Sequence, residues 1–174
     1  DAWQQRGVKG HFEGDFPWMP YHEFLTEQAA EIVGAQAKEV VMMNSLTANL
    51  HFMMASFYQP TAQRSKILIE DHAFPSDHYA VESQLKHHNK NVDDNLLLWT
   101  PRADEELLNY DDLWHILENQ GDEIALILLP GVQYYTGQVL DMKRITEVAH
   151  AKGIKVGFDL AHAAGNIELS LHDW

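Results

Sequence analysis

The sequence of 174 residues contains no cysteine. This absence excludes disulfides, thiolate catalysis and cysteine-ligated zinc within the chain. It also fits a protein of the reducing cytosol, so we expect a cytoplasmic location.

Basic residues are scarce. The chain has 12 Lys and Arg against 26 Asp and Glu, which gives a formal net charge of −14. Nucleic-acid binding requires clustered Lys and Arg that displace the counterions of phosphate groups. The charge balance therefore argues against a nucleic-acid partner.

Long apolar runs are missing as well. No run approaches the roughly 18–20 residues of a membrane-spanning helix, and no basic segment followed by an apolar one indicates a signal peptide. We therefore expect no membrane association. The chain starts without Met, and we expect that residues precede DAWQQRGVKG in the native protein.

Several short motifs are also absent. The sequence has neither a Walker A pattern nor GxGxxG, so nucleotide binding has no motif support. It has 11 histidines but no HExxH pattern. His87 and His88 are adjacent on a predicted helix, where neighbouring side chains point apart and do not readily chelate one ion. We therefore expect no metal site.

Apolar runs of strand type alternate with amphipathic stretches through most of the chain. We predict strands at 39–43, 66–70, 95–100, 124–129 and 154–160. We predict helices at 48–58, 77–88, 110–119 and 140–152, the last ending near Gly153, and a loop followed by a helix at about 19–36. Because the strand runs are continuously apolar, both faces of the sheet should be covered. This pattern is typical of an α/β fold with a mostly parallel sheet flanked by helices.

The segments that follow the predicted strands are the candidate site segments, because ligands of open α/β sheets bind beyond the carboxyl ends of the strands. The segment 100–106 is a polar turn that we expect at the surface. The others are 44–49, 71–79, 130–138 and the pair Asp159 and His162.

Two of these segments allow both an ordinary and a functional interpretation. Ser45 or Thr47 suits the N-cap of the helix that follows, and the same helix start suits an anion such as phosphate. The loop PGVQYYTGQ (130–138) suits a packed tyrosine pair or the lining of a pocket. The residues alone do not choose between these interpretations.

The segment AFPSDHY (73–79) also has two interpretations. Phe74 precedes Pro75, which favours extended backbone at Phe74, and Ser76 or Asp77 suits the cap of the next helix. Phe74 fits a core position, or a flat face on which a planar ligand stacks.

Asp159 ends an apolar run, where a buried carboxylate is costly unless it is paired. An ion pair or a helix cap would satisfy it, and so would a cationic ring nitrogen. His162 fits a core histidine or a second contact to such a ring.

Four sequence blocks carry a resemblance through essentially the whole chain. They are NSLTANLH (44–51), KILIEDHAFPSDHYAVESQL (66–85), GVQYYTGQ (131–138) and VGFDLAHAAGNIELSLHDW (156–174). In order and spacing they resemble kynureninase, a family of pyridoxal-phosphate (PLP) enzymes with the aspartate-aminotransferase fold. Under this resemblance, 1–36 form an N-terminal loop and helix, and 37–174 form part of the large PLP-binding domain.

The resemblance implies PLP as cofactor, with contacts that carry over residue by residue. The matched cofactor contacts are Leu46, Thr47, Phe74, Pro75, Ser76, Asp77, Asp159 and His162. Leu46 and Thr47 match the phosphate-binding residues, and Phe74 matches the ring stacked on the pyridine. Asp159 matches the carboxylate paired with the pyridine nitrogen, and His162 lies beside the ring.

Other implications concern residues around the cofactor. His11 matches a histidine of the substrate's aromatic-ring pocket, and Pro130 falls where the family often has a hydroxyl residue. The Schiff-base lysine of the family lies beyond Trp174, so this chain contains no catalytic residue and should be inactive alone. The remainder of the large domain and the C-terminal small domain would also lie outside it.

The resemblance also implies an activity: the hydrolytic cleavage of L-kynurenine or 3-hydroxy-L-kynurenine by a cytoplasmic homodimer in tryptophan catabolism and NAD biosynthesis. Two alternatives remain. One is another enzyme of the same fold, a class-V aminotransferase or a cysteine desulfurase. The other is a non-catalytic relative that keeps the fold for binding.

Overall fold

A computed structural model describes all residues, 1–174, and they divide into two compact units. One unit comprises residues 1–44 and 168–173, and the other comprises residues 45–167 with Trp174. None of the helices has the length and apolar character needed to cross a lipid bilayer.

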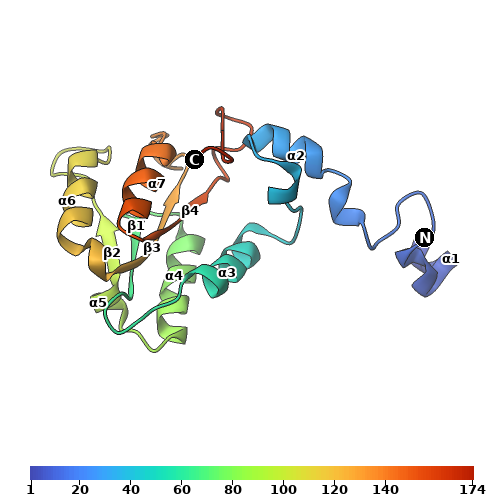
Figure 1. The fold of residues 1–174 in the computed structure, drawn as a ribbon, viewed down its shortest axis with the longest axis horizontal. Coiled ribbons are helices and arrows are strands. Elements are labelled where there is room, and N and C mark those ends of the chain that lie inside the picture. Colours follow the sequence, from blue (N-terminus) through green and yellow to red (C-terminus); the bar gives the residue numbers. More distant parts are fainter. The chain divides into compact units, whose positions relative to one another are not determined.

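The larger unit contains a four-stranded parallel sheet (Figure 1). The strands are β1 (Lys66–Glu70), β2 (Leu96–Trp99), β3 (Ile124–Pro130) and β4 (Lys155–Asp159), in the spatial order β2-β1-β3-β4. Parallel neighbours require crossover connections, which here contain the helices. The predicted α/β class with a parallel sheet is confirmed.

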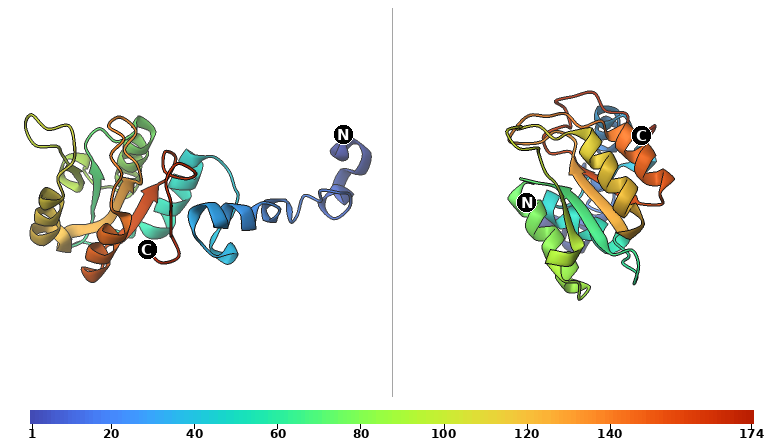
Figure 2. Two further views of the ribbon diagram at one scale, coloured as in Figure 1. Left: turned by 90° about the horizontal axis from the view of Figure 1, so that it is seen from above. Right: turned by 90° about the vertical axis from the view of Figure 1, so that its left-hand side faces the viewer.

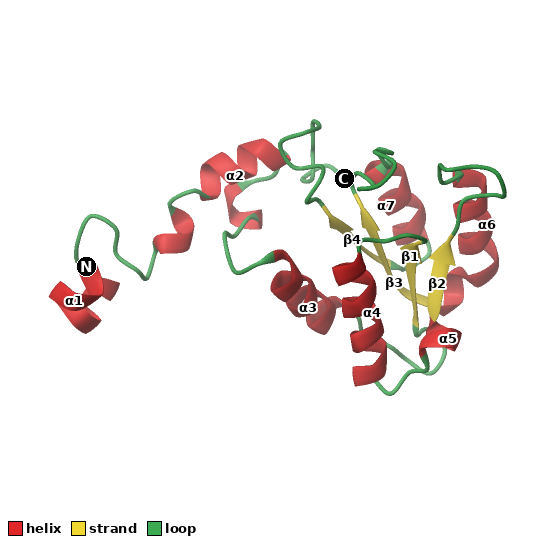
Figure 3. Cartoon of the chain, turned by 180° about the vertical axis from the view of Figure 1, so that it is seen from behind, coloured by secondary structure: helices red, strands yellow, loops and turns green.

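Helices cover both faces of this sheet (Figure 3), and Figure 2 shows the same layers from two further directions. The helices of this unit are α3 (Leu46–Phe57), α4 (Pro75–His87), α5 (Val92–Asn95), α6 (Tyr110–Gln120) and α7 (Met142–Ala151). One core joins α6 and α7 to the sheet through residues such as Leu113, Ile127 and Ile145. A second core joins α3 and α4 to the opposite face, with Met54 and Val81 on Leu126.

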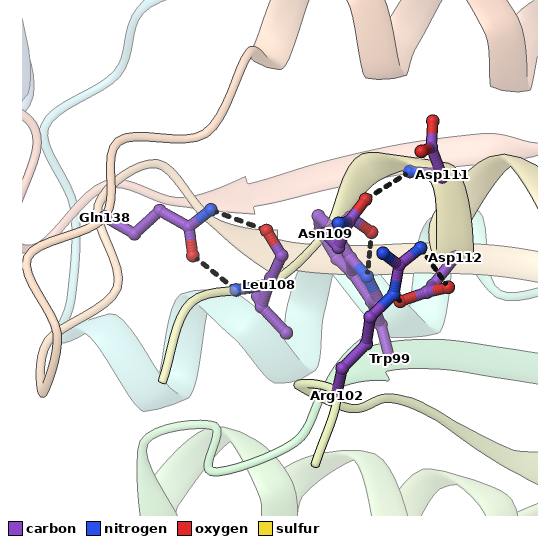
Figure 4. Close-up of polar contacts among 7 residues, drawn as sticks. All are labelled: Trp99, Arg102, Leu108, Asn109, Asp111, Asp112 and Gln138. Atoms are coloured by element: carbon purple, nitrogen blue, oxygen red, sulfur yellow. Dashed lines mark hydrogen bonds and ion pairs between the residues drawn. The ribbon is translucent and has the colours of Figure 1, made fainter. Parts of the chain in front are cut away.

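The loop between β2 and α6 is held by side chains at both of its ends (Figure 4). Trp99 Nε1 donates to the carbonyl of Asn109 at 3.0 Å, and the Gln138 amide forms two hydrogen bonds, of 2.8 and 2.9 Å, with the backbone of Leu108. Residues 102–106 between these anchors are exposed, which confirms the predicted surface turn.

The smaller unit contains α1 (Ala2–Arg6), α2 (Thr26–Val33) and three short 3₁₀ helices, Gly7–His11, Tyr21–Glu23 and Ala37–Glu39. Residues 168–173 join it through backbone bonds from Leu171 to Val33 and from His172 to Gly34. Gly34 has φ 61°, and a Cβ there would collide with the backbone of Leu169, so this contact requires glycine. The helix predicted at about 19–36 is shorter than expected, because α2 begins at Thr26 and ends at Val33, before the left-handed Gly34.

One strand prediction is wrong. Residues 40–43 pair with no strand, and residues 37–39 form a 3₁₀ helix, so 39–43 is not part of the sheet. The side chains of Val41 and Met42 are 50% and 44% exposed. A five-residue apolar run is compatible with a strand but does not specify one, because pairing requires a neighbour in register. The other four strands and the four predicted helices at 48–58, 77–88, 110–119 and 140–152 are confirmed. The helix end predicted near Gly153 is confirmed too, since Gly153 follows α7 with φ 72°.

Candidate active site

Three carboxyl groups meet in a small cavity at the carboxyl edge of the sheet. Glu70 ends β1, Asp77 lies in the first turn of α4, and Asp159 ends β4. The full lining is Glu70, Phe74, Asp77, Pro130, Val132, Tyr134, Asp159 and His162. No Lys or Arg is among these residues, so the cavity favours a cationic group from a ligand.

Asp159 is placed by the end of β4. Its backbone carbonyl accepts from the Gly131 N–H at 2.8 Å, and its carboxylate Oδ1 accepts from the Ala161 N–H at 2.8 Å. Side chains alternate along a strand, and Phe158 packs toward the α6–α7 core, so Asp159 faces the side where α4 lies. Asp159 lines the same cavity as Asp77, and the two side chains share a hydrogen bond.

Asp77 is 93% buried, with 7% of its surface exposed. Burial, followed by the hydrogen bond to Asp159 and the charge of that carboxylate, raises the pKa of Asp77 from 3.8 to about 7. The Ser76 hydroxyl donates to Asp77 Oδ1 at 3.2 Å, which opposes the rise. Because the two side chains share a hydrogen bond in a buried setting, they do not readily carry a negative charge at the same time.

An aromatic rim borders these carboxyl groups. The rings of Phe74 and Tyr134 meet edge to face with centroids 5.1 Å apart, and Tyr134 lies 6.4 Å from the His162 ring. Phe74 is 44% exposed, so it is not a core residue, and the stacking interpretation is favoured. Its backbone is extended, with ψ 134°, as expected before proline.

The start of α4 differs from its predicted cap. Phe74 occupies the N-cap position without a side-chain hydrogen bond, and Pro75 is the first helical residue. The prediction that Ser76 or Asp77 caps this helix is therefore wrong. Proline suits the first helical position because an N–H there has no partner within the helix, so its absence costs no hydrogen bond.

Leu46 and Thr47 are the first two residues of α3, and both are exposed. Ser45 occupies the N-cap position, but its side chain makes no capping hydrogen bond. Leu46 and Thr47 do not line the carboxyl cavity. The helix start remains suited to an anion through its dipole and N–H groups.

His11 belongs to the smaller unit. Its ring meets Trp18 edge to face at 5.2 Å, and a Cβ at Gly10 would collide with the same tryptophan. The segment GHFEGDFPW (10–18) thus has a close-packed ring pair. The substrate-binding role of His11 stays a prediction.

Three cavity residues were not predicted from the sequence: Glu70, Val132 and Tyr134. Glu70 was read as the end of an apolar strand, although it is the only acid in KILIE. Tyr134 lies in the loop 130–138, for which a packed tyrosine pair and a pocket lining were both open, and the structure supports the pocket lining. Gln133 shapes this loop, since its Nε2 donates to the His72 carbonyl at 2.9 Å while its Oε1 accepts from the Tyr135 N–H.

The residues present fit the ring of PLP. A planar ring with a cationic nitrogen requires a carboxylate at one edge and an apolar face, which Asp159 and Phe74 supply. Pro130 lies in the same cavity, and its ring offers no hydrogen-bond donor. A hydroxyl contact at that position is therefore absent.

The chain belongs to the aminotransferase class-V family, whose pattern matches residues 20–174. Kynureninases from Koribacter versatilis and Homo sapiens are similar to it, with 56% and 49% identity over 99% and 100% of this chain. These matches cover 41% and 37% of the two relatives, so the chain spans about two fifths of their length.

A solved structure supports the fold. A C-DES variant with glycine covalently linked to its PLP cofactor superposes with a TM-score of 0.72 over 97% of this chain and 43% of that one. At 18% identity, this likeness shows the fold alone.

Proposed function

We propose that the whole protein is a PLP-dependent kynureninase. It would hydrolyse the Cβ–Cγ bond of L-kynurenine or its 3-hydroxy form. One water is consumed, and the products are anthranilate or 3-hydroxyanthranilate and L-alanine. The 56% identity to a kynureninase across nearly the whole chain carries this proposal, and the carboxyl cavity beside Phe74 supports it.

The proposal assigns a role to each matched residue. When bound, PLP supplies an electron sink for cleavage. The Asp159 carboxylate holds the proton on the pyridine nitrogen, because opposite charges in a partly desolvated site stabilise each other. Phe74 covers one ring face and excludes water there. The remaining proposed contacts are Leu46 and Thr47 to the phosphate, Pro75, Ser76 and Asp77 in the cofactor-binding turn, and His162 beside the ring.

Substrate binding and the remaining machinery extend the proposal beyond this unit. His11 would contact the aromatic ring of the substrate, and the Schiff-base lysine would follow Trp174. Residues 37–174 would form part of the large PLP-binding domain. We further propose a cytoplasmic homodimer that acts in tryptophan catabolism and NAD biosynthesis, without nucleic-acid or membrane partners.

The test uses the whole protein with PLP and L-kynurenine, followed by anthranilate fluorescence. Production of anthranilate together with an equal amount of L-alanine supports the proposal. PLP bound without any product would contradict it.

Parallel incubations distinguish the alternatives. Sulfide released from L-cysteine would indicate a desulfurase, and a keto acid formed from an amino donor would indicate an aminotransferase. No reaction with any substrate would favour a non-catalytic relative. The high identity to kynureninases does not favour these alternatives.

A further inference from the structure

Glu70 is a buried acid to which the proposed function assigns no role. It is the last residue of β1, is 3% exposed, and pairs in register with the fully buried Trp99 on β2. It lines the same cavity as Asp77 and Asp159. A carboxyl group in such a position is costly when ionised and unpaired, so its presence requires an explanation.

The surroundings of Glu70 contain other acids but no lysine or arginine. Asp71 follows it in the chain, Asp77 faces it from α4, and Asp159 faces it from β4. The loops after β3 and β4 contribute Tyr134 and His162 to the cavity. From β2 the register partner is Trp99, so no lysine or arginine of the lining compensates a carboxylate here.

These surroundings fix the protonation state of Glu70 in the absence of a ligand. Burial has the largest effect and raises its pKa from 4.5 to about 8. A hydrogen bond from its own backbone N–H opposes this rise, and the three neighbouring carboxylates add to it. Glu70 is therefore mainly neutral at pH 7.

We propose that Glu70 holds a proton in the ligand-free cavity and releases it when a cationic ring binds at Asp159. The inference rests on the proposed function, since it requires the PLP ring in this cavity. The ring would bring one positive charge into a cavity whose lining contains no lysine or arginine. That charge stabilises the ionised form of Glu70, and the proton passes to solvent.

The coupling is reciprocal. If ring binding weakens the hold of Glu70 on its proton, then removal of that proton strengthens ring binding by the same factor. Glu70 thus makes cofactor capture depend on pH. A merely structural Glu70 would stay neutral throughout and would not influence cofactor affinity.

The experiment measures proton release when PLP binds to the whole protein stripped of cofactor. Calorimetry at pH 7 in two buffers of different ionisation enthalpy gives the number of protons released. Wild type is compared with Glu70→Gln, which mimics the neutral acid, and with Glu118→Gln, an exposed acid on α6. We expect wild type and Glu118→Gln to release up to about one proton more per site than Glu70→Gln.

Equal proton release from wild type and Glu70→Gln would overturn the inference. PLP occupancy is read separately by absorbance, and turnover by anthranilate fluorescence. A difference in release without anthranilate would leave the inference standing while the proposed substrate fails. Turnover with equal release would leave the function standing while the inference fails, and failure to bind PLP would overturn both.

A stability measurement gives a second test. A buried acid with a raised pKa binds its proton more tightly folded than unfolded, so it lowers stability as pH rises from about 4.5 to about 8. Glu70→Gln should therefore have a higher Tm than wild type when both are cofactor-free at pH 8. A lower Tm would assign Glu70 a structural role and contradict the inference.

A third test applies if Glu70→Gln does not fold. Difference infrared spectra of Asp77→Asn, with and without PLP, then follow the C=O stretch of a protonated carboxyl group that remains. Loss of this band on PLP binding supports the inference. An unchanged band overturns it.

Discussion

The helices on the two faces of the sheet begin in different ways. On one face, the Asn109 side chain accepts from the Asp111 N–H at the start of α6, at 2.9 Å. The Asp141 side chain accepts from the Arg144 N–H at the start of α7, at 3.0 Å. Each cap gives a hydrogen-bond acceptor to a backbone N–H that has no helical partner, so α6 and α7 are capped by residues of this chain.

On the other face, the two long helices have no such caps, although the short α5 does, since the Asn91 side chain accepts from the Asp93 N–H. Ser45 at the start of α3 makes no side-chain capping bond, and Phe74 at the start of α4 has no polar side chain. All eight proposed cofactor contacts belong to α3, the start of α4, or the end of β4 with the loop after it. The carboxyl cavity also includes the ends of β1 and β3 and the loop after β3. The helices on both faces pack against the sheet, and among the four long helices only α3 and α4 begin without a side-chain cap.

The largest expected effect comes from removing the charge at the site. In the whole protein, Asp159→Ala should lower turnover by roughly 10²–10³-fold, because the cationic ring loses its carboxylate in a partly desolvated cavity. Steady-state kinetics with anthranilate fluorescence measures this loss. Asp159→Asn removes the charge but keeps the shape of the side chain, so it shows which of the two matters.

Asp141→Ala is the matched control on the capped face. It should cost about 1 kcal/mol of the free energy of unfolding and leave turnover per folded molecule unchanged. Near wild-type turnover in Asp159→Ala would exclude the proposed pairing with the ring nitrogen. An equal loss in Asp141→Ala would remove the distinction between the two faces.

A smaller effect is expected at the aromatic rim. Phe74→Ala should weaken PLP binding by about 1–3 kcal/mol, the range for a lost buried aromatic contact. Cofactor titration followed by absorbance measures the change. Phe74→Leu keeps much of the apolar area without the ring face, so its loss should be intermediate. If the leucine variant binds as tightly as wild type, stacking contributes little.

The sequence predicted the parts of this fold that depend on local pattern. The runs at 66–70 and 124–129 were identified as strands because they are continuously apolar between turn residues, and Gly153 was identified as a helix end. The run at 39–43 has the same local pattern but no partner strand. Strand pairing is a tertiary property, so the sequence could not reject it.

The site was predicted less completely, for a related reason. Asp159 was found because it is an acid at the end of an apolar run, and Phe74 because it lies after a strand and before Pro75. Glu70 was missed although it also ends an apolar run, because its significance depends on Asp77 and Asp159 lying beside it. The sequence placed these three acids in separate segments. Their shared cavity emerges only when the parallel strands align their carboxyl ends.

The capped face allows a prediction of moderate size. Asn109→Ala should lower the free energy of unfolding by about 1 kcal/mol, because the Asp111 N–H loses its acceptor. Urea denaturation of the whole protein measures this change. Asn109→Asp preserves the capping oxygen and should retain most of the stability. If both variants lose the same amount, the cap is not the cause.

The smallest effect should come from the corresponding position on the other face. Ser45→Ala removes a hydroxyl that makes no capping bond, so stability should change by less than about 0.5 kcal/mol. Urea denaturation compares the free energies of unfolding of Ser45→Ala and Asn109→Ala, which both truncate the side chain at the N-cap position of a helix. A loss near 1 kcal/mol in Ser45→Ala would show that α3 is capped in solution like α6. If Ser45→Ala loses little stability and PLP raises the free energy of unfolding, the N–H groups at the start of α3 are partnered by the ligand rather than by the Ser45 side chain.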